Sequence, residues 1–275
     1  MTAATLHTDI VPSRQGWRAL LWIAPLTALW VALNYAFPII PASGVSMVAA
    51  RLAIHVLIAL GLWLALERAE LTPAQRRNAW LGVMIPFTLW LALIWGSAIN
   101  GVFQGGITPF PLIPFAIFLP VIICTPIMLL SKRIGQVLDA MPASWLIALQ
   151  AYRVLGSAFL IGWARGLVPG VFALPAGIGD VTTGLLAVPV AILLAAGRLE
   201  GRKAAVAWNV FGLLDFAIAV SIGLMIAPGP MQVIVPSIPN ATGGIYPNVM
   251  IPAFGVPSSI LLHVLSLRQL RRCRR

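Results

Sequence analysis

Charged side chains are scarce in this sequence, and acidic ones are the scarcest. Only 9% of the 275 residues are charged, and seven of the charged residues are Asp or Glu; in a typical soluble domain about a quarter of the residues are charged. The sequence also lacks an HExxH metal motif, a GxSxG nucleophile motif and the spacing of a phosphate loop. These absences exclude a water-soluble domain, and they leave no signature from which to predict an enzyme.

Cysteine is almost absent as well. Cys124 lies in a hydrophobic run and Cys273 in the basic tail, so we expect the two thiols at different depths and no disulfide between them. With no CxxC pair and no Cys/His cluster, the sequence offers neither a zinc site nor an attachment site for covalently bound haem. We therefore predict no metal and no cofactor.

Long hydrophobic runs are what the sequence has in abundance. Hydrophobic residues make up 60% of the chain, in runs of the roughly 20 residues that an α-helix needs to cross a bilayer. The first run is too long for the core of a signal peptide and lacks a small-x-small cleavage site, so we expect it to be retained. The runs predict an all-α integral membrane protein with eight transmembrane helices, at 17–37, 46–66, 79–98, 111–131, 151–172, 178–197, 204–227 and 248–268.

The basic residues, which give a formal net charge of +11, fall almost wholly in alternate loops and in the C-terminal tail. This distribution is not a nucleic-acid patch; it indicates cytoplasmic loops under the positive-inside rule. Four tryptophans fall near the predicted inner ends, where an indole keeps its N–H hydrated: Trp17, Trp80, Trp145 and Trp208. We predict a multi-pass protein of the cell inner membrane, with both termini in the cytoplasm, the lipid bilayer as partner and no nucleic acid partner.

The loops on the other side contain no Lys or Arg and are rich in Pro and Gly; they lie around 38–45, 99–110, 173–177 and 228–247. Two segments that include parts of these loops resemble each other. Residues 105–114 match residues 243–252 at both glycines and at Ile107/Ile245, Pro109/Pro247, Ile113/Ile251 and Pro114/Pro252.

Each copy precedes the fourth helix of a half, so the match indicates two four-helix repeats, 1–140 and 141–275. With four helices in each half, the repeats would be parallel and related by an axis along the membrane normal. The alternative is that membrane loops share this composition without a duplication.

Another pattern runs through the second half, from Arg153 to Gly156, Phe159 and Gly162, then through residues 177–186, then to Gly197-Arg198. This spacing resembles the DoxX-like group of four-helix membrane proteins over about residues 150–225. The resemblance implies two four-helix bundles, and the group's association with quinol oxidation implies a redox function as one alternative. Asp180 stands where that group has Glu, and the first half departs from the pattern, so no functional residue is carried over.

Three charges are predicted at similar depth in the outer leaflet, and a histidine shares a helix face with one of them. Arg51 and His55 are four apart and share a helix face, Asp180 begins the predicted sixth helix, and Arg165 lies in the outer half of the fifth. An ionisable side chain inside hydrocarbon costs about 2.5–3.5 kcal/mol, so each needs a partner, water or a function. We predict an outward-facing cavity that binds an anionic or zwitterionic ligand. The alternative is a structural Arg165–Asp180 pair, with Arg51 extending to water.

Asp215 is predicted near the middle of the seventh helix, one turn after Gly212, where it cannot reach either surface. Small neighbours let a second helix approach, so we expect Asp215 to meet a polar group or to be protonated; proton coupling and an interhelical hydrogen bond both stay open. Arg153 is expected to extend to the inner surface. His263 is expected to be a hydrogen-bonding core residue, and haem ligation by His55 and His263 is the alternative.

The ligand-binding residues predicted from the sequence are therefore Arg51, His55, Arg165, Asp180 and Asp215. The function that fits them best is a permease or channel-like protein of the inner membrane for a small anionic or zwitterionic solute. Two alternatives stay open: a membrane redox subunit that holds quinone or haem, and an assembly partner that transports nothing.

Overall fold

The computed structural model describes residues 13–37, 45–104, 112–197, 199–229, 231–238 and 243–272, and within these ranges the regular elements are all helices. Eight of the described helices are long and apolar enough to cross a membrane, which confirms the all-α class and the predicted number. The elements are α1 Ser13–Arg18, α2 Leu20–Ala36, α4 Val45–Arg68, α5 Pro73–Ile99, α6 Leu112–Leu130, α7 Lys132–Ala140, α8 Ser144–Leu149, η1 Gln150–Gly156, α9 Ser157–Ala164, α10 Gly170–Ala195, α11 Leu199–Ile226, η2 Ile251–Gly255 and α12 Val256–Arg272.

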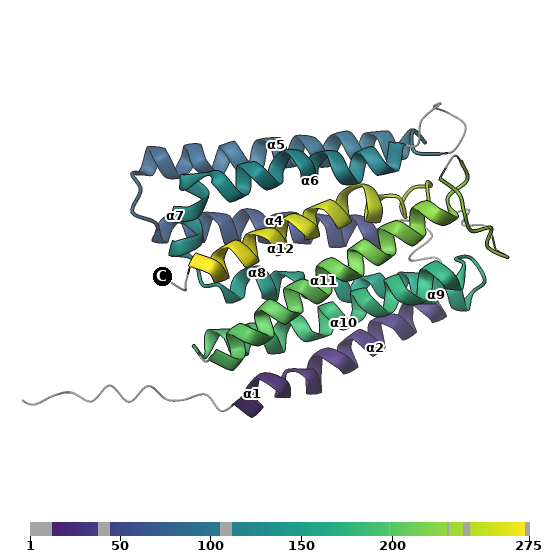
Figure 1. Cartoon of the computed structure of the whole chain (residues 1–275), viewed down its shortest axis with the longest axis horizontal. Coiled ribbons are helices and arrows are strands. Elements are labelled where there is room, and N and C mark those ends of the chain that lie inside the picture. The colour runs from purple at the N-terminus through teal and green to yellow at the C-terminus, as the bar shows by residue number, and fades with distance from the viewer. Residues whose placement is uncertain are drawn as a thin grey trace, which may run out of the picture.

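The second half of the chain forms the centre of the bundle. Helix α10 packs against α8, η1, α9 and α11, and α12 packs against α8 and α11. The helices of the first half lie around this group: α2 contacts α9 and α10, α4 contacts α7 and α8, and α6 contacts α12. Figure 1 shows α10, α11 and α12 between α2 on one side and α5 and α6 on the other. The spans of the second half are accordingly the more buried.

The outer helices keep large apolar side chains exposed, as helices that face lipid do. Rows of Leu, Ile, Val and Phe along α2, α4, α5 and α6 remain uncovered. Two helix starts in the first half are capped by side chains: Thr72 and Gln75 form a capping box at the start of α5, and Ser131 caps α7 by accepting from the Ile134 N–H. These caps fix the two short turns that follow α4 and α6.

Six of the eight predicted helices match the observed spans to within six residues at either end. The fifth and sixth were placed wrongly, because they are observed at Ser144–Ala164 and Gly170–Ala195. The turn between them contains Gly166 with φ +69°, and Pro169 immediately precedes α10. Pro175 suggested a loop at 173–177, but it lies inside α10. This shift moves every charge on the two helices to a different depth from the one predicted.

Two of the predicted interfacial tryptophans also lie deeper than expected. Trp80 and Trp208 donate their indole N–H groups to the carbonyls of Ala59 and Thr183, each at 2.9 Å. Trp208 is buried in the core between α10 and α11. The reason is that α5 and α11 begin more than a turn earlier than predicted.

The two described ends of the chain lie at the same end of the bundle, where α1, α7 and the last turn of α12 are found (Figure 1). Helix α12 is fastened there to α6 and α7. The Arg272 Nε donates to Asp139 at 2.7 Å, and Arg268 donates to the carbonyls of Met128 and Ser131. The basic C-terminal helix end is therefore held against the short α7 helix.

Several predictions fall on residues 1–12, 38–44, 105–111, 198, 230, 239–242 and 273–275, which lie outside the described residues. These include Pro109 and most of the first repeat motif, and Cys273. The boundary predicted between the repeats, at residue 140, coincides with the end of α7. The two-repeat organisation itself stays a prediction.

Candidate functional site

Arg153 lies at the centre of a buried polar cluster. It belongs to η1, a 3₁₀ segment in the middle of the fifth span, and its side chain is 1% exposed. Its Nε donates to Asp180 Oδ1 at 2.8 Å, and its Nη2 forms an ion pair with Asp215. Its Nη1 donates to the Gly212 carbonyl at 3.5 Å and to His263 Nε2 at 3.2 Å. One guanidinium therefore joins the fifth span to α10, α11 and α12.

The hydrogen bond from Arg153 sets the tautomer of His263. An arginine can only donate, so His263 accepts at Nε2 and carries its proton on Nδ1, which donates to Asn209 Oδ1 at 2.9 Å. Asn209 then donates to Ser266 Oγ at 3.0 Å and to the Ala205 carbonyl at 2.7 Å. A haem ligand needs a free ring nitrogen, and both nitrogens of His263 are engaged. The network therefore disfavours the haem hypothesis at this position.

Aromatic rings enclose the cluster. The Arg153 guanidinium carbon lies 3.9 Å from the centroid of the Phe216 ring, and the His263 ring has its centroid 4.9 Å from that of Trp208. Such walls exclude water and lower the local dielectric constant, which strengthens the attraction between ionised groups and raises the cost of leaving one unpaired.

Glycines let the helices approach closely enough for these contacts. A Cβ on Gly179 would lie 1.7 Å from Asp215 Oδ1, and a Cβ on Gly212 would lie 2.5 Å from the His263 ring. Real Cβ atoms essentially never come within 3.0 Å of such neighbours. The side chains of Asp215 on α11 and His263 on α12 thus occupy space that exists only because these positions lack side chains.

The carboxylates lie far from either end of their helices. At about 1.5 Å per helical residue, Asp180 is about 15 Å from the start of α10 and Asp215 about 17 Å from the end of α11. A hydrocarbon layer about 30 Å thick would place both near its centre. At that depth ionisable groups are costly unless they pair or serve a function.

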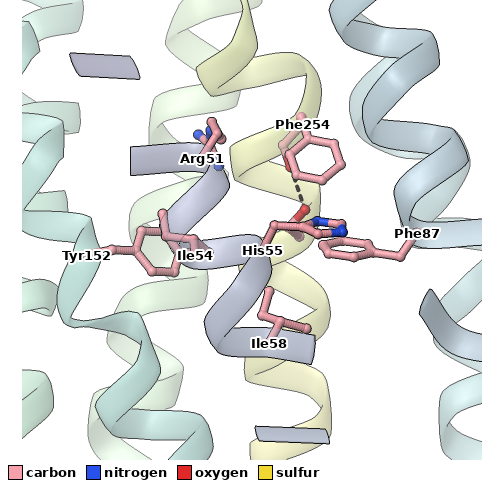
Figure 2. A pocket seen from close by; sticks show the side chains of 8 residues that line it. Arg51, Ile54, His55, Ile58, Phe87, Tyr152 and Phe254 are labelled. Carbon is pink, nitrogen blue, oxygen red and sulfur yellow. Dashed lines mark hydrogen bonds between the residues drawn. The ribbon is translucent and has the colours of Figure 1, made fainter. Parts of the chain in front are cut away.

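A small pocket lies on the other side of η1, between α4, α5 and α12 (Figure 2). Its enclosed space is about 10 Å³, about what one water molecule needs and far below the roughly 300–1,000 Å³ of sites for drug-sized ligands. A compact solute therefore enters only if the side chains that line the pocket move apart. The lining residues are Arg51, Ile54, His55, Ile58, Phe87, Tyr152, Phe254 and Ser258.

Arg51 is the exceptional residue of this pocket. It is 8% exposed, yet it makes no hydrogen bond or ion pair with any residue that the structure describes. Its guanidinium carbon lies 5.7 Å from the centroid of Phe254, and its Nη2 fills the space beside Gly255, where a Cβ would come within 2.3 Å. The carboxylate of Asp180 attracts Arg51 electrostatically, but at a longer range than a hydrogen bond or ion pair. Arg51 is thus a buried cation without a direct counter-ion among the described residues.

His55 contributes a second unpaired group. Figure 2 shows its ring lying on the Phe87 ring, and the two centroids are 4.9 Å apart. Its Nε2 shares a hydrogen bond of 2.9 Å with Thr88 Oγ1, whereas its Nδ1 is covered and has no partner among the described residues. If Thr88 donates to Nε2, Nδ1 carries the ring proton and is free to donate to a ligand.

Tyr152 connects the pocket with the cluster. Its ring lines the pocket, and its hydroxyl lies 2.5 Å from Ser259 Oγ on α12. The next residue is Arg153, whose side chain points to Asp180 and Asp215. The 3₁₀ segment η1 therefore presents one residue to the pocket and its neighbour to the buried carboxylates. On the facing side, Phe254 and Gly255 belong to η2, a π-helical turn, a distortion that is frequent at functional sites.

The structure corrects the predicted outer cluster. Asp180 pairs with Arg153 and not with Arg165, because α10 begins earlier than predicted and carries Asp180 to mid-span. Arg165 follows the last residue of α9; it donates to the Tyr35 carbonyl and lies 5.1 Å from the Tyr35 ring centroid. The expectation that Arg153 extends to the inner surface was wrong, since two carboxylates hold it in the interior. The expectation that Asp215 meets a polar group is confirmed.

The predicted residues therefore divide into three places: Asp180 and Asp215 in the cluster, Arg51 and His55 in the pocket, and Arg165 at a helix end. Sequence reasoning missed the central role of Arg153 and the part played by Tyr152. A signal was present, because Gly156, Gly179 and Gly212 each lie within one turn of a charged residue on the same helix. Small residues beside intramembrane charge mark places where helices meet closely.

Comparison with known families adds one finding. Residues 110–271 match the model of a family described as a domain of unknown function, DUF8737. The chain belongs to the DUF8737 family. The matched region runs from the start of α6 almost to the end of α12 and contains the whole Arg153 cluster, whereas Arg51 and His55 lie before it. Searches of curated proteins and of solved structures returned no match.

Proposed function

We propose that this DUF8737 member is a multi-pass protein of the cell inner membrane that acts as a permease for a small anionic or zwitterionic solute. The observation that carries the proposal is a mid-span charge cluster beside a pocket whose arginine makes no hydrogen bond or ion pair with any described residue. Intramembrane ionisable residues commonly line solute or proton pathways. In this proposal the pocket receives the solute, and the Asp180–Arg153–Asp215 cluster responds to its charge.

The orientation follows from the basic residues. Arg18, Arg68, Arg76 and Lys132 all lie at the end of the bundle that holds α1, α7 and the close of α12. The positive-inside rule assigns this end to the cytoplasm. Since α4 begins at the opposite end, Arg51 lies about 9 Å below the outer helix start. The pocket is therefore nearer to the periplasmic side.

A purely structural function explains the cluster but not the pocket. Arg153 and its partners satisfy one another, as a scaffold would require, and a non-transporting assembly partner could use them in that way. Arg51 has no such partner in the described part of the chain. Asp180 attracts Arg51 only at longer range, so the buried N–H groups of Arg51 remain costly in a scaffold, whereas they are useful where an anion binds.

Transport can be tested without knowing the solute. Vesicles reconstituted with the full chain would be challenged with a panel of small anions, zwitterions, cations and neutral solutes, and uptake followed by light scattering. We expect faster entry than into protein-free vesicles for at least one anion or zwitterion. Asp180→Asn and Asp215→Asn should alter that entry, and Glu200→Gln, which changes an exposed carboxylate at the start of α11, should not. Entry no faster than into protein-free vesicles across the whole panel would reject the permease.

A further inference from the structure

The charges inside the bundle balance only when Arg51 is included. The groups that face the Asp180–Asp215 pair are Arg153 from η1, His263 from α12 and, at longer range, Arg51 from α4. His263 is neutral in the tautomer that its hydrogen bonds require, and Tyr152 is an uncharged phenol facing the same region. When both carboxylates are ionised, two guanidinium groups offset them, although Arg51 makes no direct contact with either carboxylate.

We infer that the Arg51 pocket binds a compact monoanion with an apolar body, a carboxylate or a sulfonate, and that one proton enters the Asp180–Asp215 pair with each anion bound. The inference deepens the proposed permease by naming its class of solute and its coupling ion. It concerns binding, so it is testable in the absence of transport.

The chemistry of the pocket selects the ligand. Arg51 supplies a cation with unused N–H donors, and His55 supplies a second donor at Nδ1 in one tautomer. The other walls are mainly apolar, with Ile54, Ile58 and Phe87 among them (Figure 2). Such a site favours an anionic head group attached to a small hydrocarbon or aromatic body. Because the enclosed space is about 10 Å³, the lining side chains must move apart to admit that body, and a compact body requires the smallest movement.

The coupling follows from charge balance in a low dielectric. A bound anion takes Arg51 as its own counter-ion and leaves Arg153 alone with two carboxylates. One excess negative charge in an enclosed interior is costly. A proton taken up from water by the carboxylate pair removes that excess charge. Because Arg153 bridges Asp180 and Asp215, the proton is assigned to the pair and not to one of the two residues. The occupied site thus holds an anion and a proton, with no net change in charge.

Titration calorimetry on the purified full chain in detergent tests this inference with benzenesulfonate, which stays ionised at every working pH. Repeating the titration in two buffers with different ionisation enthalpies counts the protons taken up. We expect about one proton to be taken up per anion bound near neutral pH. The Kd for benzenesulfonate should then rise by up to about tenfold for each unit by which the pH is increased. Benzyl alcohol and benzylammonium, which have the same ring without the negative charge, should bind at least about tenfold more weakly.

Variants separate the two parts of the inference. Arg51→Gln should weaken benzenesulfonate binding at least about tenfold, whereas Arg165→Gln, a matched arginine outside the pocket, should leave the Kd unchanged. Asp215→Asn carries a permanently neutral group in place of the protonated acid, so it should bind the anion without taking up a proton.

Three results would overturn the inference: no binding of benzenesulfonate, equal binding of benzyl alcohol, or an unchanged Kd in Arg51→Gln. Proton uptake that persists in both Asp180→Asn and Asp215→Asn would overturn the coupling. If Arg51→Gln fails to fold, the pH dependence of the wild-type Kd and the proton count of Asp215→Asn still decide. Binding with proton uptake but no vesicle entry would reject the permease and leave this site standing.

Discussion

At the level of single residues, Arg153 shows how one side chain can organise the interior of a helical bundle. Its guanidinium uses all three nitrogens, toward Asp180, Asp215 and His263. Lysine could keep the charge but not the planar fork that reaches two carboxylates at once. The geometry therefore requires arginine and not merely a cation.

Replacing Arg153 with Leu should destabilise the protein severely, because it leaves two buried carboxylates without a counter-ion. Removal of one partner from a buried ion pair costs about 3–5 kcal/mol, so we expect low yield and a strongly reduced Tm in detergent. Arg153→Lys should lie between Leu and the wild type. A Leu variant with wild-type Tm would show that the carboxylates do not depend on Arg153.

At the level of helices, the glycines decide how closely α10, α11 and α12 can pack. Gly179→Ala would bring a methyl group into the position now occupied by Asp215, so we expect a loss of several kcal/mol from overpacking and a disturbed ion pair. Gly82→Ala is the matched control: it lies in the interior of α5, with no atom within 4 Å of the added Cβ. The control should be neutral or more stable by about 0.5–1 kcal/mol. Equal Tm values for the two variants would contradict the packing described here.

The surface pair between α7 and α12 gives a weaker and pH-dependent effect. The hydrogen bond from Arg272 holds the pKa of Asp139 below its usual value of 3.8, so the stabilisation is fully present above that value and is lost as the pH falls below it. Both side chains are more than 40% exposed, which limits the contribution to about 0.2–1 kcal/mol. Thermal unfolding of Asp139→Asn should show a small loss at neutral pH that vanishes in acid; an equal loss at every pH would rule out the titration of Asp139 as its cause.

Hydropathy determines how many helices span the bundle, whereas packing determines which side chains meet inside it. Apolar runs predicted eight spans correctly in number, and the misplaced pair traces to one residue, Pro175, which a membrane helix tolerates because neighbouring groups satisfy the freed backbone. The partner of Asp215 could not be predicted, since it depends on which face of η1 meets α11. That Arg51 makes no hydrogen bond or ion pair with any described residue could not be predicted either, because an absent partner leaves no sequence pattern.

For the whole molecule, the placement of basic residues predicts a single topology. Reporter fusions after residues 70, 135, 200 and 275 should read as cytoplasmic, and fusions near 105 and 238 as periplasmic, because positively charged loops are retained inside. The reporter would be one that is active on only one side of the membrane. One inverted position in this series would contradict the eight-span topology, whatever the function.

The arrangement of the halves bears on how the molecule works. The second half forms the centre and carries the cluster, while α4 and α5 of the first half complete the pocket. The DUF8737 match covers the centre but not α4. The charge-bearing core thus coincides with the family's domain, and the side chain proposed to bind the anion, Arg51, comes from outside it.

The central claim is that an anion at Arg51 and a proton at the Asp180–Asp215 pair cross the membrane together. It is tested by loading proteoliposomes with a pH-sensitive dye and imposing an inward gradient of benzenesulfonate. Wild-type protein should acidify the vesicle interior, Asp215→Asn should admit the anion without acidification, and Arg51→Gln should admit neither. An interior that stays at its starting pH with wild-type protein, or one that acidifies equally with Asp215→Asn, would contradict the claim.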